Sequence, residues 1–289
     1  MENEQTCFPC HKLLQIQSKS FLERVKRIMF YLNEEFADNF QGTDPFKMLQ
    51  AMEGNIYRQV KARKTFQFAL NGKSYFAKLH SGVGWLEIIK NLLTLKMPII
   101  GARNEWEAIH RLQELNIATM NAVAYGERGW NPASRESFIV TEELTDTVSL
   151  EDYCKQWQES PADRRIKRKL IEKVAAIASN LHKNGICHRD FYLCHFLLHE
   201  GAEPFPKLSL IDLHRALVRK NLAQRWVIKD IAGLLYSAKT IGLSDRDMLR
   251  FMRHYQGKNL RSALSEQRQF WQEVKQRAEA MFEKLGPAT

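Results

Sequence analysis

Hydrophobic positions in the first part of the chain recur at two different spacings. Between residues 12 and 40, large apolar residues return every three or four positions, and lysines and arginines lie between them. This spacing predicts an amphipathic helix. A basic amphipathic helix can lie on an anionic membrane or dock on the domain that follows it, and the pattern alone leaves both interpretations open.

An alternating pattern follows, and it predicts a β-hairpin. Residues 65–70 and 74–79 alternate around Asn71-Gly72, a pair that strongly favours a type I′ turn. Residues 85–95 have a heavily apolar helical pattern, for which we expect packing within the protein in preference to membrane contact. A second helix is predicted over residues 105–115.

The second half of the chain is mainly helical. Short strands are predicted at 122–125, 138–141, 207–213 and 216–219, and helices at 150–159, 166–184 and most of 224–284; residues 145–149 have a loop-like pattern. Strands therefore come first and helices second, with a hinge near residues 142–145. This order predicts an α+β chain with an N-terminal extension over 1–53, a small β-rich lobe over 54–144 and a larger helical lobe over 145–289.

Composition and charge narrow the classes of partner. The 289 residues include 43 lysines and arginines against 33 acidic residues, a formal net charge of +10. Such an excess favours an anionic partner, but the sequence has no zinc-finger pattern, RNP-like motif or isolated basic arm, so we do not expect nucleic acid. Apolar runs stay below the roughly 18 residues that span a bilayer, and the acidic N-terminus lacks a secretory pattern. We therefore expect a cytosolic chain.

The five cysteines do not indicate a disulfide framework. Cys7 and Cys10, followed by His11, match the pattern for covalent haem attachment, but that chemistry requires export. We therefore interpret this segment as an exposed terminus. Cys187 and Cys194 each precede a histidine, at a spacing unlike that of a zinc finger.

Four residues follow one another in the order that the protein-kinase-like fold uses. Lys78 lies near the end of a predicted strand, Glu105 lies on a helix, Asp190 ends a His-Arg-Asp tripeptide, and Asp212 follows an apolar strand. In phosphoryl transfer, catalysis is mostly positioning and electrostatics. We expect Lys78 to hold the phosphates of ATP, Glu105 to orient Lys78, Asp212 to ligate Mg²⁺, and Asp190 to accept the proton of the acceptor hydroxyl.

Other residues of the predicted helical lobe support these four. His188 and Arg189 are expected to stabilise the catalytic loop, and Asp230 to brace it from a helix. Only the 17 residues 213–229 separate Asp212 from Asp230, which leaves no room for a long activation segment. The G-x-G-x-x-G pattern of protein kinases is missing before the strand lysine, so the basic segment 58–64 is either a substitute phosphate clamp or a solvated strand.

The sequence resembles the Kdo/WaaP family of lipopolysaccharide core heptose(I) kinases from about residue 54 to residue 260. The matching segments include 74–78 (SYFAK), 87–93 (EIIKNLL), 105–112 (EWEAIHRL), 138–144 (FIVTEEL), 149–154 (SLEDYC), 188–198 (HRDFYLCHFLL) and 211–216 (IDLHRA). The His-Arg-Asp-x-Tyr-x-Cys-His pattern is specific to that family. The resemblance implies a bilobal protein-kinase-like fold.

The resemblance also implies an activity and further site residues. The implied reaction transfers the ATP γ-phosphate to O-4 of the first inner-core heptose of lipid A–core, on the cytosolic face of a Gram-negative inner membrane. Backbone groups of Glu142 and Leu144 would meet adenine, and Tyr192 and Arg215 would face the anionic acceptor. His195 stands where protein kinases place a metal-binding asparagine, so it is either a ligand or a hydrogen-bonding residue, because imidazole suits Mg²⁺ less well than oxygen does.

Two other functions stay open at this point. A kinase for protein side chains would need a peptide groove and an activation segment. A non-catalytic, basic kinase-like binding module would not need Lys78, Asp190 and Asp212 together. The anionic membrane surface and an acidic carrier protein are both reasonable partners for a basic chain, and the sequence specifies neither.

Overall fold

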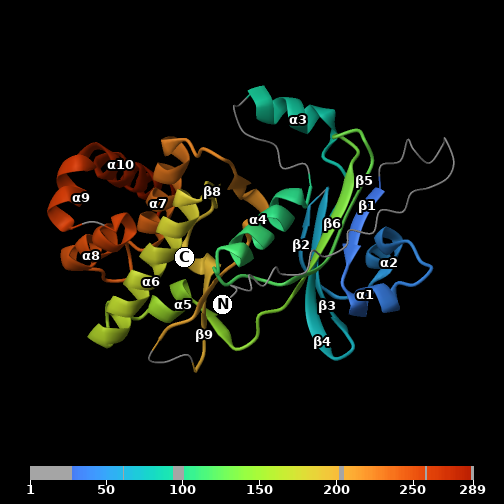
Figure 1. Ribbon diagram of the computed structural model, residues 1–289, viewed down its shortest axis with the longest axis horizontal. Helices are drawn as coiled ribbons and strands as arrows, with labels where there is room; N and C mark the ends of the chain where they lie inside the picture. Colours follow the sequence, from blue (N-terminus) through green and yellow to red (C-terminus); the bar gives the residue numbers. More distant parts are fainter. Residues whose placement is uncertain (1–27, 61, 94–100, 202–204, 258, 288–289) are drawn as a thin grey trace, which may run out of the picture. The chain divides into compact units, whose positions relative to one another are not determined.

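A computed structural model describes residues 28–60, 62–93, 101–201, 205–257 and 259–287 (Figure 1). The chain forms two compact units. The first comprises Met1–Arg103 and Ala122–Glu142, and the second comprises Asn104–Asn121 and Glu143–Thr289. Within the described ranges, no helix combines the length and the apolar character needed to cross a membrane.

The first unit is built on an antiparallel sheet in the order β1-β5-β6-β4-β3-β2. Its strands are β1 (Ile28–Leu32), β2 (Asn55–Val60), β3 (Arg63–Leu70), β4 (Lys73–His80), β5 (Ala122–Arg128) and β6 (Glu136–Glu142), and its helices are α1 (Glu34–Asn39), α2 (Pro45–Ala51) and α3 (Gly84–Leu93). The predicted hairpin is confirmed as β3 and β4. Asn71 and Gly72 have φ angles of 51° and 77°, the two positive values that a type I′ turn requires.

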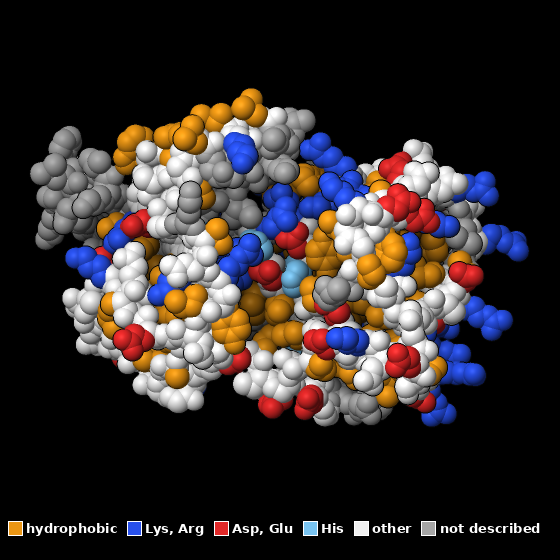
Figure 2. All heavy atoms as spheres, turned by 180° about the vertical axis from the view of Figure 1, so that it is seen from behind, with side chains coloured by type: hydrophobic (Ala, Val, Ile, Leu, Met, Phe, Trp, Pro, Cys, Tyr) orange, Lys and Arg blue, Asp and Glu red, His pale blue; other side chains and the backbone are white. Residues whose placement is uncertain are grey.

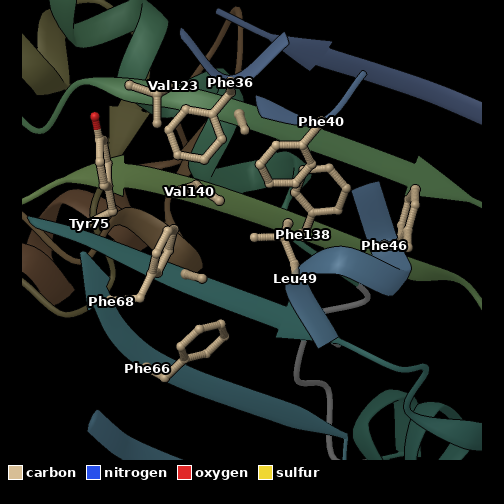
Figure 3. Close-up of a cluster of buried hydrophobic side chains, with 12 residues drawn as sticks. Phe36, Phe40, Phe46, Leu49, Phe66, Phe68, Tyr75, Val123, Phe138 and Val140 are labelled. Atoms are coloured by element: carbon tan, nitrogen blue, oxygen red, sulfur yellow. The ribbon is translucent and has the colours of Figure 1, made fainter. Parts of the chain in front are cut away.

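The amphipathic helix predicted over residues 12–40 is wrong for its described part. Residues 28–32 form β1, which pairs with β5, and only 34–39 are helical; residues 12–27 lie outside the described ranges. The apolar residues Phe36 and Phe40 face the protein interior. Phe36 is fully buried and meets Tyr75 edge-on, with 5.1 Å between ring centres. Figure 3 shows Phe36, Phe40 and Phe46 directed toward the strands of the sheet, with Phe68 and Phe138.

The expectation that residues 85–95 pack within the protein is also wrong. Helix α3 covers 84–93, and its large apolar side chains are mostly exposed. Among the α3 side chains that the structure describes, Ile88 is buried. In Figure 1, α3 stands at the edge of the first unit, beside the turn between β5 and β6.

The second unit is mainly helical, which confirms the predicted α+β class. Its helices are α4 (Arg103–Glu114), α5 (Leu150–Cys154), α6 (Arg164–Lys183), α7 (Gln224–Ser237), α8 (Asp245–Gln256), α9 (Leu260–Glu266) and α10 (Arg268–Leu285). The first residue of α4, Arg103, belongs to the first unit. Strands β7 (Thr147–Ser149), β9 (Phe196–His199) and β10 (Leu208–Leu210) form one small sheet, and β8 (Ile186–Cys187) pairs with β11 (Leu217–Val218). The predicted helix 150–159 ends at Cys154, and the loop-like residues 147–149 form a strand because they pair with β9.

A glycine links the long helix to the loop that follows it. Helix α6 ends at Lys183, and Gly185 has a φ angle of 76°, the left-handed conformation that favours glycine just after a helix end. A Cβ atom there would lie 1.8 Å from the carbonyl oxygen of Arg219, so the chain needs glycine where β8 begins. Gly185 also accepts a 2.9 Å hydrogen bond from the Arg219 amide, which fixes the entry to the loop that carries Asp190.

Candidate active site

The loop after β8 is held from below by one buried carboxylate. The oxygens of Asp230, on α7, accept hydrogen bonds from the backbone amides of His188 and Arg189 at 2.7 and 2.8 Å. Burial alone would raise the pKa of Asp230, but the hydrogen bond from His182 and the electrostatic interaction with that ring outweigh it and lower the pKa. The carboxylate is therefore ionised at neutral pH and holds two consecutive amides in position.

Two histidines connect this loop to the strand end at Asp212. His188 is fully buried, its Nε2 donates to the carbonyl oxygen of Ile211 at 2.9 Å, and burial lowers its pKa, so the ring is neutral. His195 stacks on it with 5.5 Å between ring centres. Its Nδ1 lies 2.6 Å from the carbonyl oxygen of Asp190, so Nδ1 carries the proton. Its Nε2 then faces Asp212, 3.7 Å from Oδ2.

Asp212 lies directly after β10 and Ile211, and it has a left-handed backbone conformation with φ 59° and ψ 53°. His214, two residues on, donates from Nδ1 to Asp212 Oδ1 at 2.7 Å. Sequence reasoning missed His214, although its place in Asp-Leu-His was the available signal. With one oxygen held by His214, the other oxygen of Asp212 is directed toward His195.

Asp190 is paired with a cation from the same stretch of chain. Arg215 donates from Nη1 to Asp190 Oδ1 at 2.7 Å. Tyr192 is half-buried beside the loop, and burial raises the pKa of its hydroxyl. Gly233 of α7 makes room for that ring, since a Cβ atom at this position would lie 3.1 Å from it. The buried Arg189 guanidinium lies over the Trp226 ring at 5.3 Å, and this packing supports the loop.

The second unit therefore brings together Asp190, His195, Asp212 and Arg215. The buried side chains of His188 and Asp230 support the loop from the protein interior. Two other predicted residues lie in the first unit: Lys78 is on β4, opposite Thr65 and Ile139, and Glu142 ends β6. Two more lie in the second unit. Glu105 is fully buried on α4, and the carbonyl oxygen of Leu144 accepts a 3.1 Å hydrogen bond from the Thr147 hydroxyl. Arg63 and Lys64, in the candidate phosphate clamp, begin β3 and line a cavity of about 200 Å³.

The Asp212 carboxylate fits a magnesium ion that is bound partly by nucleotide. Mg²⁺ prefers oxygen ligands and is held in kinases by one or two carboxylates together with phosphates and water. Among the described residues, no group of three or more His, Cys, Asp or Glu side chains is arranged to hold a metal by itself. Asp212 and His195 supply two donors at 3.7 Å from each other, so the rest of a coordination shell would come from phosphate and water.

The second unit also contains a large apolar cavity away from these charges. Its volume is about 680 Å³, and α5, α6, α7, α8 and α10 surround it. The apolar lining includes Leu170, Val174, Ile231, Phe251 and Trp271. Three cations, Lys239, Arg268 and Lys275, also contribute to its walls. The sequence analysis predicts helices over these positions and does not predict a cavity.

A β-sheet unit, a helical unit and a His-Arg-Asp loop followed by a strand-end aspartate define a protein-kinase-like phosphotransferase with an alcohol acceptor. Residues 47–255 match the model of the lipopolysaccharide kinase (Kdo/WaaP) family. The chain belongs to this family, as the resemblance in the sequence implied.

Relatives named lipopolysaccharide core heptose(I) kinase WaaP support the same assignment. The protein from Escherichia coli is 48% identical over 242 residues, which cover 83% of this chain and 91% of the relative. The protein from Pseudomonas aeruginosa is 48% identical over 257 residues, covering 88% and 96%. A solved structure described as WaaP in complex with acyl carrier protein has a TM-score of 0.78 and 42% identity, and the match covers 88% of this chain and 99% of that one.

Proposed function

We propose that this kinase transfers the γ-phosphate of ATP to O-4 of the first heptose of the lipopolysaccharide inner core. The acceptor is lipid A–core, and the reaction takes place at the cytosolic face of the inner membrane. Curated relatives of 48% identity carry the heptose(I) kinase name. The observation that carries the mechanism is the Asp190 carboxylate, held by Arg215 at 2.7 Å in the loop that also anchors His195 beside Asp212.

Asp190 is the proposed general base. Arg215 occupies Oδ1, so Oδ2 is the oxygen that we assign to the proton of the attacking hydroxyl. A base held in a fixed direction aligns the hydroxyl for in-line attack and accepts its proton as the new bond forms. Asp230 contributes by holding the two amides that precede Asp190.

Asp212 and His195 would hold Mg²⁺, and Lys78 would hold the nucleotide phosphates, with Glu105 orienting that lysine. Magnesium, when bound, neutralises the charge of the phosphates. His214 holds Oδ1 of Asp212, and Oδ2, 3.7 Å from His195 Nε2, is the oxygen that we assign to the ion. Backbone groups of Glu142 and Leu144 would receive the adenine.

The acceptor would be recognised through its negative charge. Lipid A phosphates and Kdo carboxylates make it strongly anionic. Arg219, Lys220 and Arg225 are exposed and follow Asp212 closely in the chain, and Arg215 and Tyr192 lie at the loop itself. Neighbouring cations would draw the acceptor to the loop. A protein side-chain kinase is less well supported, because the 17-residue segment after Asp212 contains no long activation loop.

Asp190→Asn tests the proposed reaction. Purified wild-type and variant proteins are incubated with ATP, Mg²⁺ and lipid A–core that lacks heptose phosphate, and mass spectrometry measures the phosphate added and its position. We expect wild type to phosphorylate O-4 and the variant to lose about 10²- to 10⁴-fold in kcat, as removal of a general base does. Asp38→Asn, at an exposed acid on α1, is the control and should retain activity. Wild-type turnover by Asp190→Asn would exclude the base role, and phosphate on another group would exclude O-4.

We further propose that an acyl carrier protein is a partner of this chain. The solved relative is described as a complex with that protein. Carrier proteins of this kind are acidic and carry an acyl chain on a flexible arm. The apolar cavity of about 680 Å³ fits an acyl chain, and its walls carry three cations, Lys239, Arg268 and Lys275, against two acids, Asp245 and Asp247, an excess that suits an acidic surface.

A further inference from the structure

Helix α3 exposes a row of large hydrophobic side chains. Trp85, Leu86, Ile89 and Leu93 are 54%, 87%, 48% and 80% exposed. Ile88 is buried and fixes the inner side of the helix. Figure 2 shows hydrophobic side chains in a run along the upper edge of the molecule, where α3 lies in Figure 1.

A tryptophan from a different part of the chain extends this surface. The amide of Gly84, the first residue of α3, donates to the carbonyl of Ala133 at 2.9 Å. Gly82 has a φ angle of 86°, and a Cβ atom there would lie 2.7 Å from the same oxygen. The start of α3 is therefore fixed to the 129–135 loop, which carries Trp130 with 72% exposure. We call Trp85, Leu86, Ile89, Leu93 and Trp130 the apolar rim.

The rim concentrates apolar surface in one place. The described residues include eleven large hydrophobic residues that are exposed, and five of them are in the rim. The other six are distributed over β1, β2, Phe205 and the end of α10. Single exposed hydrophobic residues are ordinary on a protein surface, whereas a contiguous patch indicates a binding face.

The composition of the rim favours a phospholipid surface over a protein groove. Tryptophan, with an apolar ring and a polar N–H, is enriched at the boundary between headgroups and acyl chains, and the rim has two of them. Lys90 is exposed on the same short helix, and Arg135 lies in the loop of Trp130. These cations, in a chain of net charge +10, are complementary to anionic headgroups.

We propose that the apolar rim is a membrane-binding surface, with α3 lying in the headgroup region of an anionic bilayer. Leu86 and Leu93 enter the acyl boundary, the two tryptophans lie at headgroup depth, and Lys90 meets lipid phosphates. A helix of 10 residues is about 15 Å long and is suited to lying in the plane of a bilayer. This inference draws on the lipid-linked acceptor of the proposed function and adds the surface that brings the enzyme to it.

Vesicle flotation of the full chain tests this role. The double variant Leu86→Glu and Leu93→Glu is compared with Phe205→Glu and Leu285→Glu, which removes two exposed apolar residues elsewhere and adds the same charge. The vesicles contain phosphatidylethanolamine with phosphatidylglycerol, or phosphatidylcholine alone. We expect wild type and the control to float with the anionic vesicles. The partition coefficient of the rim variant should be at least about tenfold lower, because each inserted leucine contributes to binding through its buried apolar area. Brominated acyl chains should quench wild-type tryptophan fluorescence, and Trp85→Phe with Trp130→Phe should remove that quenching.

Two outcomes would overturn the proposal. One is equal flotation of the rim variant and the control. The other is a wild-type chain that does not float but dimerises in analytical ultracentrifugation and becomes monomeric in the rim variant, which would make the rim a contact between copies. Circular dichroism establishes that each variant is folded. The flotation assay contains neither ATP nor acceptor. A failure to float would therefore contradict the membrane-binding rim and not the proposed phosphorylation, and a failure to phosphorylate would contradict the proposed function and not the rim.

Discussion

Asp230 has almost no exposure to water, and its two oxygens face two consecutive backbone amides. A buried carboxylate is stable only when its charge is matched, and here two amides and His182 match it. Asp230 binds the backbone of the two residues that precede Asp190, the proposed general base. Removing the charge should therefore affect the shape of the loop more than the chemistry itself.

We expect Asp230→Asn to lower the free energy of unfolding by about 3 kcal/mol at pH 7, because the amides lose an anion and one meets an NH₂ group. The lowered pKa means that the ionised carboxylate stabilises the fold above its unfolded pKa, near 3.8, and that this contribution is lost as the pH falls through the still lower folded value. The difference in the free energy of unfolding between wild type and variant should become smaller below about pH 4. Urea unfolding at several pH values measures it. Asp245→Asn, at an exposed helix start, should change stability by less than about 1 kcal/mol, and an equally small change for Asp230→Asn would contradict its role.

Order along the chain is the signal by which the sequence selects its candidate site residues. Lys78, Glu105, Asp190 and Asp212 were found by order, and the structure brings Asp190 and Asp212 into one cluster with His195. The ion pair of Arg215 with Asp190 and the bond of His214 to Asp212 depend on the left-handed turn at Asp212. No composition or spacing rule encodes the direction of a side chain after such a turn.

At the scale of elements, the largest error concerns residues 28–40. Phe36 and Phe40 are spaced like one face of a helix, and this local pattern is real over 34–39. Residues 28–32 are a strand because β5 offers a free edge for pairing, and the paired residues of β5 lie 92 to 100 positions further along the chain. Long-range pairing overrides local spacing, so no reading of the segment alone could predict it.

Phe36→Ala tests the assignment of this segment to the core of the first unit. Phe36 is fully buried against Phe40, Phe68 and Tyr75, so we expect a loss of about 3 to 5 kcal/mol in the free energy of unfolding. Phe205→Ala removes an exposed ring and should change stability by less than about 1 kcal/mol. Urea unfolding followed by far-UV circular dichroism measures both. Similar small effects of the two substitutions would place residues 34–39 outside the core.

At the scale of the whole molecule, the order of strands and then helices was sufficient to predict the α+β class. The cavity in the second unit was not predictable in the same way. Its lining residues, such as Leu170 and Val174, have the helical spacing of a packed interior, and a gap between helices leaves no mark on that spacing. Only the way in which α6, α7, α8 and α10 pack determines whether their apolar faces meet.

The cavity makes the proposed partnership measurable. We expect an acylated carrier protein to bind this chain at least tenfold more tightly than the same carrier without an acyl group, because each buried methylene contributes about 0.8 kcal/mol. Val174→Trp fills part of the cavity and should reduce the difference between the two carriers. Isothermal titration calorimetry measures both affinities, and circular dichroism checks the folding of the variant. Equal affinity of the two carriers for wild type would show that the cavity does not receive the acyl group.

The link between Asp230 and the catalytic loop also determines when activity arises during synthesis. The loop residues His188 and Arg189 leave the ribosome some 40 residues before Asp230, which supplies the acceptors for their amides. Helix α7, which carries Asp230, packs in turn on α10 near the end of the chain. A nascent chain therefore has all of its proposed catalytic side chains before it has the means to position them. We therefore expect activity only after α10 has been synthesised and α7, packed on it, has docked on the loop.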